Sequence, residues 1–96
     1  MIDFETAQQN AEQEIQRIQQ TSAFWGVYQL GPLRLARETD VTWVFFRGSR
    51  ELIEQSHAPG GLFITVDKQT GRIWSQEEIE AYYTQRATAE PQKIAA

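Results

Sequence analysis

The first 20 residues carry apolar side chains at steps of three and four, a spacing that places them on one face of an α-helix. Glutamines and other polar residues fill the remaining positions. Asp3 is a suitable N-cap, and Thr21 and Ser22 are expected to end the helix. The apolar face is narrow and rich in alanine, so we expect this helix to lie across a sheet. Its members are Phe4, Ala7, Ala11, Ile15 and Ile18.

The middle of the chain has the residue types of β-strands. Residues 23–30 (AFWGVYQL) are of this type, and Leu33 and Leu35 alternate with Arg34 and Ala36 as in a half-exposed strand. Between them, Gly31-Pro32 indicates a turn, a bulge or a kinked edge strand. Residues 41–47 (VTWVFFR) form the strongest strand pattern, with apolar side chains on both faces. This pattern implies a central strand that is covered on both sides, or one covered face and one exposed apolar face.

Residues 60–75 (GGLFITVDKQTGRIWS) have the pattern of a strand, a tight turn, a returning strand and a helix start. Asp67 can bond the backbone two residues on, and Gly71 supplies the positive φ that such turns need. Ser75 is the expected N-cap of a second helix, and Glu78 completes a capping box. This helix is expected to end near Arg86.

These elements predict an α+β fold: an N-terminal helix, a three- or four-stranded antiparallel sheet and a C-terminal helix, with the helices packed on the sheet. At 96 residues the chain has the length of one domain. We place this domain at residues 1–87. Residues 88–96 follow no pattern and contain Pro91, so we expect a flexible C-terminal tail.

The composition narrows the classes of function. The net charge of −4 argues against general binding of nucleic acid and fits a basic partner, although it also fits simple solubility. The chain has no cysteine, no apolar segment long enough to span a membrane and no signal-peptide pattern at its N-terminus. We therefore expect a cytoplasmic protein that binds neither membranes nor nucleic acid.

No catalytic, cofactor-binding or metal-binding residues are predicted. His57 is the only histidine, and no phosphate-binding glycine loop is present. Four basic residues fall between positions 34 and 50, beside Trp43, Phe45 and Phe46, an arrangement that could bind single-stranded nucleic acid, but the spacing does not match the RNA-recognition signature. These basic residues are Arg34, Arg37, Arg47 and Arg50.

The longest segment without a regular pattern is 48–61 (GSRELIEQSHAPGG). Ser49 could cap one or two helical turns over 50–55. Long connections in small domains are often functional, but this one could also be a crossover with Leu52 and Ile53 packed beneath it.

Three segments resemble the Immunity protein 35 family of bacterial proteins found beside polymorphic toxins. They are DFETAQQNAEQEI, TWVFFRGSRELIEQS and APGGLFITVDKQTGRI, and the resemblance covers residues 3–86. The family often has Asn-Gly or Gly-Asn before its last long strand, where this chain has Ala58-Pro59-Gly60-Gly61. The resemblance implies an immunity protein that neutralises a cognate protein toxin by binding it, without catalysis. The predicted toxin-binding residues lie within segment 48–61 or directly before it: Arg47, Arg50, Glu51, Glu54 and His57.

Two other functions remain open. A general interaction or chaperone-like module would use an exposed apolar face of the sheet to shield hydrophobic segments of other proteins. A small enzyme or ligand-binding domain would have a deep pocket with converging polar groups. An edge strand near Gly31-Pro32 also leaves a homodimer open.

Overall fold

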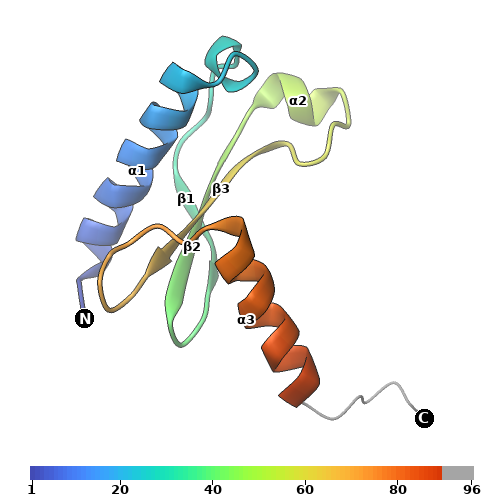
Figure 1. The fold of residues 1–96 in the computed structure, drawn as a ribbon. Coiled ribbons are helices and arrows are strands. Elements are labelled where there is room, and N and C mark those ends of the chain that lie inside the picture. The colour runs from blue at the N-terminus through green and yellow to red at the C-terminus, as the bar shows by residue number, and fades with distance from the viewer. Residues whose placement is uncertain (90–96) are drawn as a thin grey trace.

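The computed structural model describes residues 1–89 and confirms the predicted fold class (Figure 1). Its elements are helix α1 (Phe4–Thr21), a 3-10 turn η1 (Trp25–Val27), strands β1 (Arg34–Glu38) and β2 (Thr42–Gly48), helix α2 (Arg50–Glu54), strand β3 (Gly61–Asp67) and helix α3 (Gln76–Ala89). Helix α3 therefore continues three residues beyond its predicted end. The rest of the predicted tail, residues 90–96, lies outside the described residues.

The three strands form one antiparallel sheet in the order β1-β2-β3. β2 and β3 pair along their whole length, from Thr42 opposite Asp67 to Gly48 opposite Gly61. The pairing of β1 with β2 shifts register between Leu35 and Arg37, which makes a bulge in the edge strand. The bulge reverses the alternation of side chains, so the two ends of β1 do not share one pattern.

Helix α1 covers one face of the sheet, which we call the inner face. Ala7, Ala11 and Ile15 have no exposed surface and pack against Phe45 and Val66, which are also fully buried. The alanines leave room for the helix backbone to approach the sheet closely. The apolar face predicted for the first helix is thereby confirmed, including its cap, because the Asp3 carboxylate accepts a hydrogen bond from the Thr6 N–H.

The opposite, outer face is apolar at its α2 end and only partly covered. Phe46 and Phe63 pack ring to ring there, with centroids 4.6 Å apart, and Phe63 is 56% exposed. At the other end of this face Thr42 and Thr65 are buried. Of the two arrangements predicted for residues 41–47, the one with a single fully covered face is therefore observed.

The turn after β3 was predicted correctly, but the returning strand was not. Asp67 accepts hydrogen bonds from the N–H groups of Gln69 and Thr70, and Gly71 has a φ of 78°. Residues 72–74 then make only one bridge, between Val66 and Ile73. The chain leaves the sheet early because the helix start at Ser75 follows directly.

The prediction of strand structure for residues 23–30 was wrong, apart from a single bridge between Leu30 and Ser49. Residues 25–27 form the η1 turn instead. The Gln19 side-chain amide donates to the carbonyl groups of Trp25 and Tyr28, at 3.2 and 2.8 Å. These bonds satisfy backbone groups that a strand would have satisfied with a neighbouring strand.

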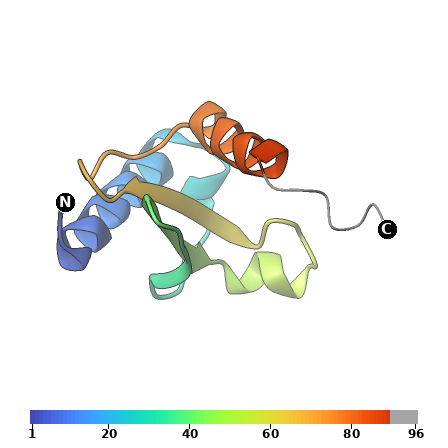
Figure 2. The same ribbon diagram turned by 90° about the horizontal axis from the view of Figure 1, so that it is seen from below.

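Helix α3 begins with the predicted capping box: the Ser75 hydroxyl accepts from the Glu78 N–H, and the Glu78 carboxylate accepts from the Ser75 N–H. Tyr82 then donates to the Asp40 carboxylate and Arg37 donates to the Tyr83 hydroxyl, so the helix reaches the turn between β1 and β2. Figures 1 and 2 both show α3 well separated from α2. The α2 end of the outer face is therefore left open.

Candidate partner-binding surface

Helix α2 presents charged side chains to solvent while one apolar side chain anchors it. The Ser49 hydroxyl caps the helix by accepting from the Leu52 N–H at 3.3 Å, and Leu52 is buried. This confirms the predicted helical turns and their cap. Arg50 and Glu54 form an ion pair at 3.0 Å whose side chains are 92% and 64% exposed, so it contributes little to stability.

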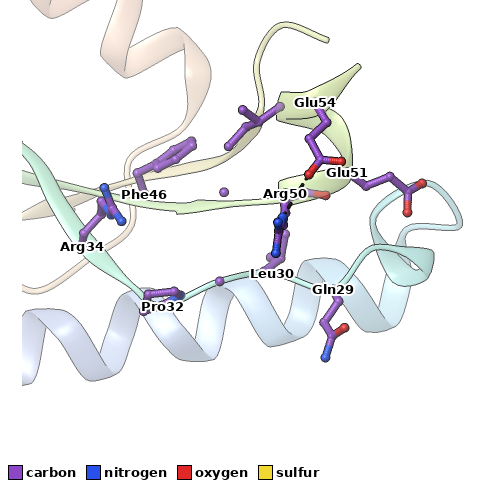
Figure 3. A pocket seen from close by; sticks show the side chains of 12 residues that line it. Gln29, Leu30, Pro32, Arg34, Phe46, Arg50, Glu51 and Glu54 are labelled. Atoms are coloured by element: carbon purple, nitrogen blue, oxygen red, sulfur yellow. Dashed lines mark hydrogen bonds and ion pairs between the residues drawn. The ribbon is translucent and has the colours of Figure 1, made fainter. Parts of the chain in front are cut away.

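An open groove of about 840 Å³ lies between α2, the end of β2 and the segment that leads into β1 (Figure 3). Its lining includes the apolar side chains of Leu30, Pro32, Phe46 and Ile53 and the charged side chains of Arg34 and α2. The groove is lined by Gln29, Leu30, Gly31, Pro32, Arg34, Phe46, Gly48, Ser49, Arg50, Glu51, Ile53 and Glu54.

The structure brings three of the five predicted binding residues to this groove and places the other two elsewhere. Arg50, Glu51 and Glu54 line the groove from α2. The Arg47 guanidinium donates to the backbone carbonyl of Gly31 at 2.7 Å and, more weakly, to that of Leu30 at 3.4 Å. It therefore holds the segment before β1 against β2.

His57 lies outside the groove, beside the η1 turn. Its ring centroid is 6.0 Å from that of Phe24, so the loop after α2 meets the turn after α1. Phe24 is 46% exposed and Val27 is 77% exposed. We call the surface formed by α2, His57 and these two apolar side chains the α2-end surface.

Phe24, Val27 and Ile53 were not among the residues predicted to bind the partner. Ile53 is 56% exposed, whereas one of the two interpretations of segment 48–61 packed it beneath the segment together with Leu52. The signal that could have identified Phe24 and Val27 is the high number of large apolar residues in 23–30. Because this segment was predicted as a strand, its apolar side chains were expected in the core. Three large exposed apolar side chains near one short helix are a feature of protein-binding surfaces.

Several carboxylates with lowered pKa values lie at the opposite end of the sheet. Hydrogen bonds from Arg72 and the Ser75 N–H lower the pKa of Glu78 to about 2. The Tyr82 hydroxyl lowers the pKa of Asp40, and Lys68 lowers that of Glu38. These carboxylates support the turn between β1 and β2 and the start of α3, so their charges stabilise structure.

Within residues 1–89, no group of three or more histidine, cysteine, aspartate or glutamate side chains is arranged to hold a metal ion. None of the helices in that part of the chain has both the length and the apolar character needed to cross a bilayer. Comparison with protein-family models, curated proteins and solved structures gives no match. The resemblance to the Immunity protein 35 family therefore stays a prediction.

Proposed function

We propose that this protein is a non-catalytic immunity protein that binds a cognate bacterial toxin in the cytoplasm through the α2-end surface. The observation that carries the proposal is the exposure of Ile53 among the charged side chains of α2, together with the exposure of Phe24 beside His57 and of Val27 in the adjacent η1 turn. The resemblance of residues 3–86 to immunity proteins supplies the class of partner. Both point to an activity that consists of binding.

The exposed apolar side chains would supply most of the binding free energy. Covering a side chain of this size contributes about 1.5–3 kcal/mol when the burial is complete. The Phe24 ring also contacts the rings of Trp25, Tyr28 and His57, so holding it in one position in a complex costs little side-chain entropy. The charged residues around them would set orientation and partner choice more than affinity.

The charges of the surface and of the whole chain favour a toxin with a basic binding face. The net charge is −4, and Glu51 and Glu54 are exposed on α2. Opposite charges on the two partners would speed their encounter, as in other fast protein–protein associations. The association rate is therefore expected to fall as the salt concentration rises.

Growth assays with the neighbouring genes in the native genome test the proposal. Each neighbouring gene product is expressed alone to find one that stops growth, and is then expressed together with this protein. We expect this protein to restore growth and to form a stable complex with the toxic product on gel filtration. If no neighbouring product is toxic, or if none is neutralised, the proposal is wrong.

The Phe24→Asp, Ile53→Asp double variant locates the binding surface. It should abolish protection, because two apolar anchors become charged groups that a complex would bury. The matched control is Gln9→Asp, Gln16→Asp, which adds the same charge on exposed positions of α1 and should keep protection. Urea unfolding of both variants verifies that each is folded. Full protection by the first variant would exclude the α2-end surface.

The exposed Phe63 on the outer face favours one alternative, a chaperone-like module that shields hydrophobic segments. Such a module would bind unrelated unfolded proteins with similar affinity. An immunity protein would bind one folded toxin and leave denatured model substrates free. Suppression of aggregation of reduced lysozyme and heated citrate synthase separates the two functions.

A further inference from the structure

The groove between α2, the end of β2 and the segment before β1, which we call the outer groove, carries opposite charges at its two ends. Arg34 lies at one end beside Phe46, and Glu51 and Glu54 lie at the other end on α2 (Figure 3). Glu54 is paired with Arg50, while the Glu51 side chain forms no ion pair or hydrogen bond within the described part of the chain. One end of the groove is therefore basic and the other is acidic.

Arg34 differs from the other cationic side chains in residues 1–89. It is exposed, and its side chain makes no ion pair, hydrogen bond or ring contact there. Each of the others contacts a carboxylate, a carbonyl group or an aromatic ring. These are Arg17, Arg37, Arg47, Arg50, Lys68, Arg72 and Arg86.

Apolar side chains lie between the charged ends. Ile53 extends toward Phe46 across Gly48, and a Cβ atom added at Gly48 would come within about 3 Å of both. Phe63 extends this apolar surface onto β3, and both Ile53 and Phe63 are 56% exposed. An apolar centre with one basic and one acidic end is self-complementary under a two-fold rotation.

We propose that a second copy of this chain covers the outer groove and forms a symmetric dimer. The two-fold axis passes near Phe46 and Ile53, so that Arg34 of each copy meets Glu51 of the other copy. Each ion pair therefore occurs twice. The apolar side chains of the two copies pack together between these pairs.

The alternative of pairing edge strands fits the structure less well. The bulge in β1 places Arg34 and Glu38 on opposite faces of the sheet, so an antiparallel pair of β1 strands could not match these charges. Pro32 has no N–H to donate, and both backbone groups of Gly31 already bond within the chain. The groove is the better surface for a second copy.

The proposed dimer is weak and concentration-dependent. The apolar area at its centre consists of a few side chains, which is less than a permanent interface buries. We expect a dissociation constant on the order of 10–100 μM. The dimer is argued from the groove alone, but it shares Ile53 and the charged side chains of α2 with the proposed toxin-binding surface, so a second copy and a toxin would compete for them. Phe24, Val27 and His57 do not line the groove.

Sedimentation velocity tests the dimer. It is measured from about 5 to 500 μM, a range that brackets the expected dissociation constant. The samples are the unmodified protein, the variants Arg34→Glu and Glu51→Arg, and an equimolar mixture of the two variants. Each single variant places like charges together twice and should weaken self-association at least tenfold. In a mixed dimer, the glutamate introduced at position 34 of one variant meets the arginine introduced at position 51 of the other, and the second contact is native. The mixture should therefore dimerise as strongly as the unmodified protein.

Circular dichroism and urea unfolding verify that the variants fold, as expected for exposed positions. The proposal is overturned if the unmodified protein is monomeric throughout this range. It is equally overturned if the single variants dimerise normally, or if the mixture stays as weak as the single variants. The double variant Arg34→Glu, Glu51→Arg provides an independent check, because it recreates both pairs with reversed charges and should also dimerise.

Discussion

Arg47 and Arg50 are three residues apart and were both predicted to bind the partner, but their surroundings differ. Arg47 is half-buried and donates hydrogen bonds to two backbone carbonyl groups of the segment that precedes β1. Arg50 is 92% exposed and pairs only with Glu54 one helical turn later. The first side chain supports the fold, and the second is free to reach a partner.

Arg47→Met is therefore expected to lower the free energy of unfolding by about 1–2 kcal/mol, because hydrogen bonds from a charged donor to half-buried carbonyl groups are lost. Arg50→Met should change it by less than about 0.5 kcal/mol, as for other exposed helical ion pairs. Urea unfolding of the two variants at pH 7 measures the difference. Equal effects of the two substitutions would show that Arg47 does not hold the segment before β1.

At the scale of single elements, the helix caps and the turn after β3 were predicted correctly because their interactions are local. Asp3, Asp67, Ser75 and Glu78 each bond a backbone group two or three residues away, so the spacing of residue types was enough to find them. The Gln19 side chain donates hydrogen bonds to carbonyl groups six and nine residues away, and no pattern in residues 23–30 predicts these bonds.

The binding surface was only partly predictable for a related reason. The charged residues of α2 stood out because their segment has no regular pattern. The exposure of Ile53, in contrast, depends on how α2 sits over Gly48 and Gly60. Periodicity in a five-residue helix cannot decide which of two adjacent apolar side chains faces the core.

The start of α3 should depend on pH through Glu78. Its pKa in the folded protein is about 2, below its ordinary value of 4.5, chiefly because Arg72 bonds its ionised form. A lowered pKa means that this contribution to stability is fully present above pH 4.5 and is lost as the pH falls toward 2. Glu78→Gln should thus be less stable than the unmodified protein at pH 7, and the difference should shrink below pH 4.5.

Urea unfolding at pH 7, 4.5, 3 and 2 measures that difference directly. Glu77→Gln is the matched control, because Glu77 is an exposed neighbour in the same turn. A stability difference for Glu78→Gln that stays constant across this range would contradict the role of the ionised carboxylate.

Helix α1 packs closely against the sheet, so a larger side chain at one of its buried positions should destabilise the protein. Ala11 is fully buried where the helix meets the inner face, and a leucine there would need space that the packed core lacks. Ala11→Leu should destabilise the protein by about 1–3 kcal/mol through overpacking. Gln16→Leu, on the exposed side of the same helix, should have little effect in the same unfolding experiment. A neutral Ala11→Leu would mean that the helix can move away from the sheet without cost.

At the scale of the whole molecule, the two long helices are held in different ways. Helix α1 buries three side chains completely in the core. Helix α3 reaches the turn between β1 and β2 through two tyrosines: Tyr82 donates to Asp40 and accepts from Arg86, and Tyr83 accepts from Arg37. Polar contacts between exposed side chains contribute less than buried apolar packing, so α3 should open without unfolding of the rest.

Hydrogen exchange of backbone amides tests this difference. Tyr82→Phe removes the hydroxyl that bonds both Asp40 and Arg86, and should speed exchange in α3 by about threefold to tenfold, in proportion to a lost exposed hydrogen bond. Exchange in α1 and β2 should not change, because local opening of α3 leaves the inner core intact. Gln85→Lys alters an exposed side chain of the same helix and serves as the control. If Tyr82→Phe speeds exchange in α1 as much as in α3, the helices open together, and the attachment of α3 is part of the global stability of the domain.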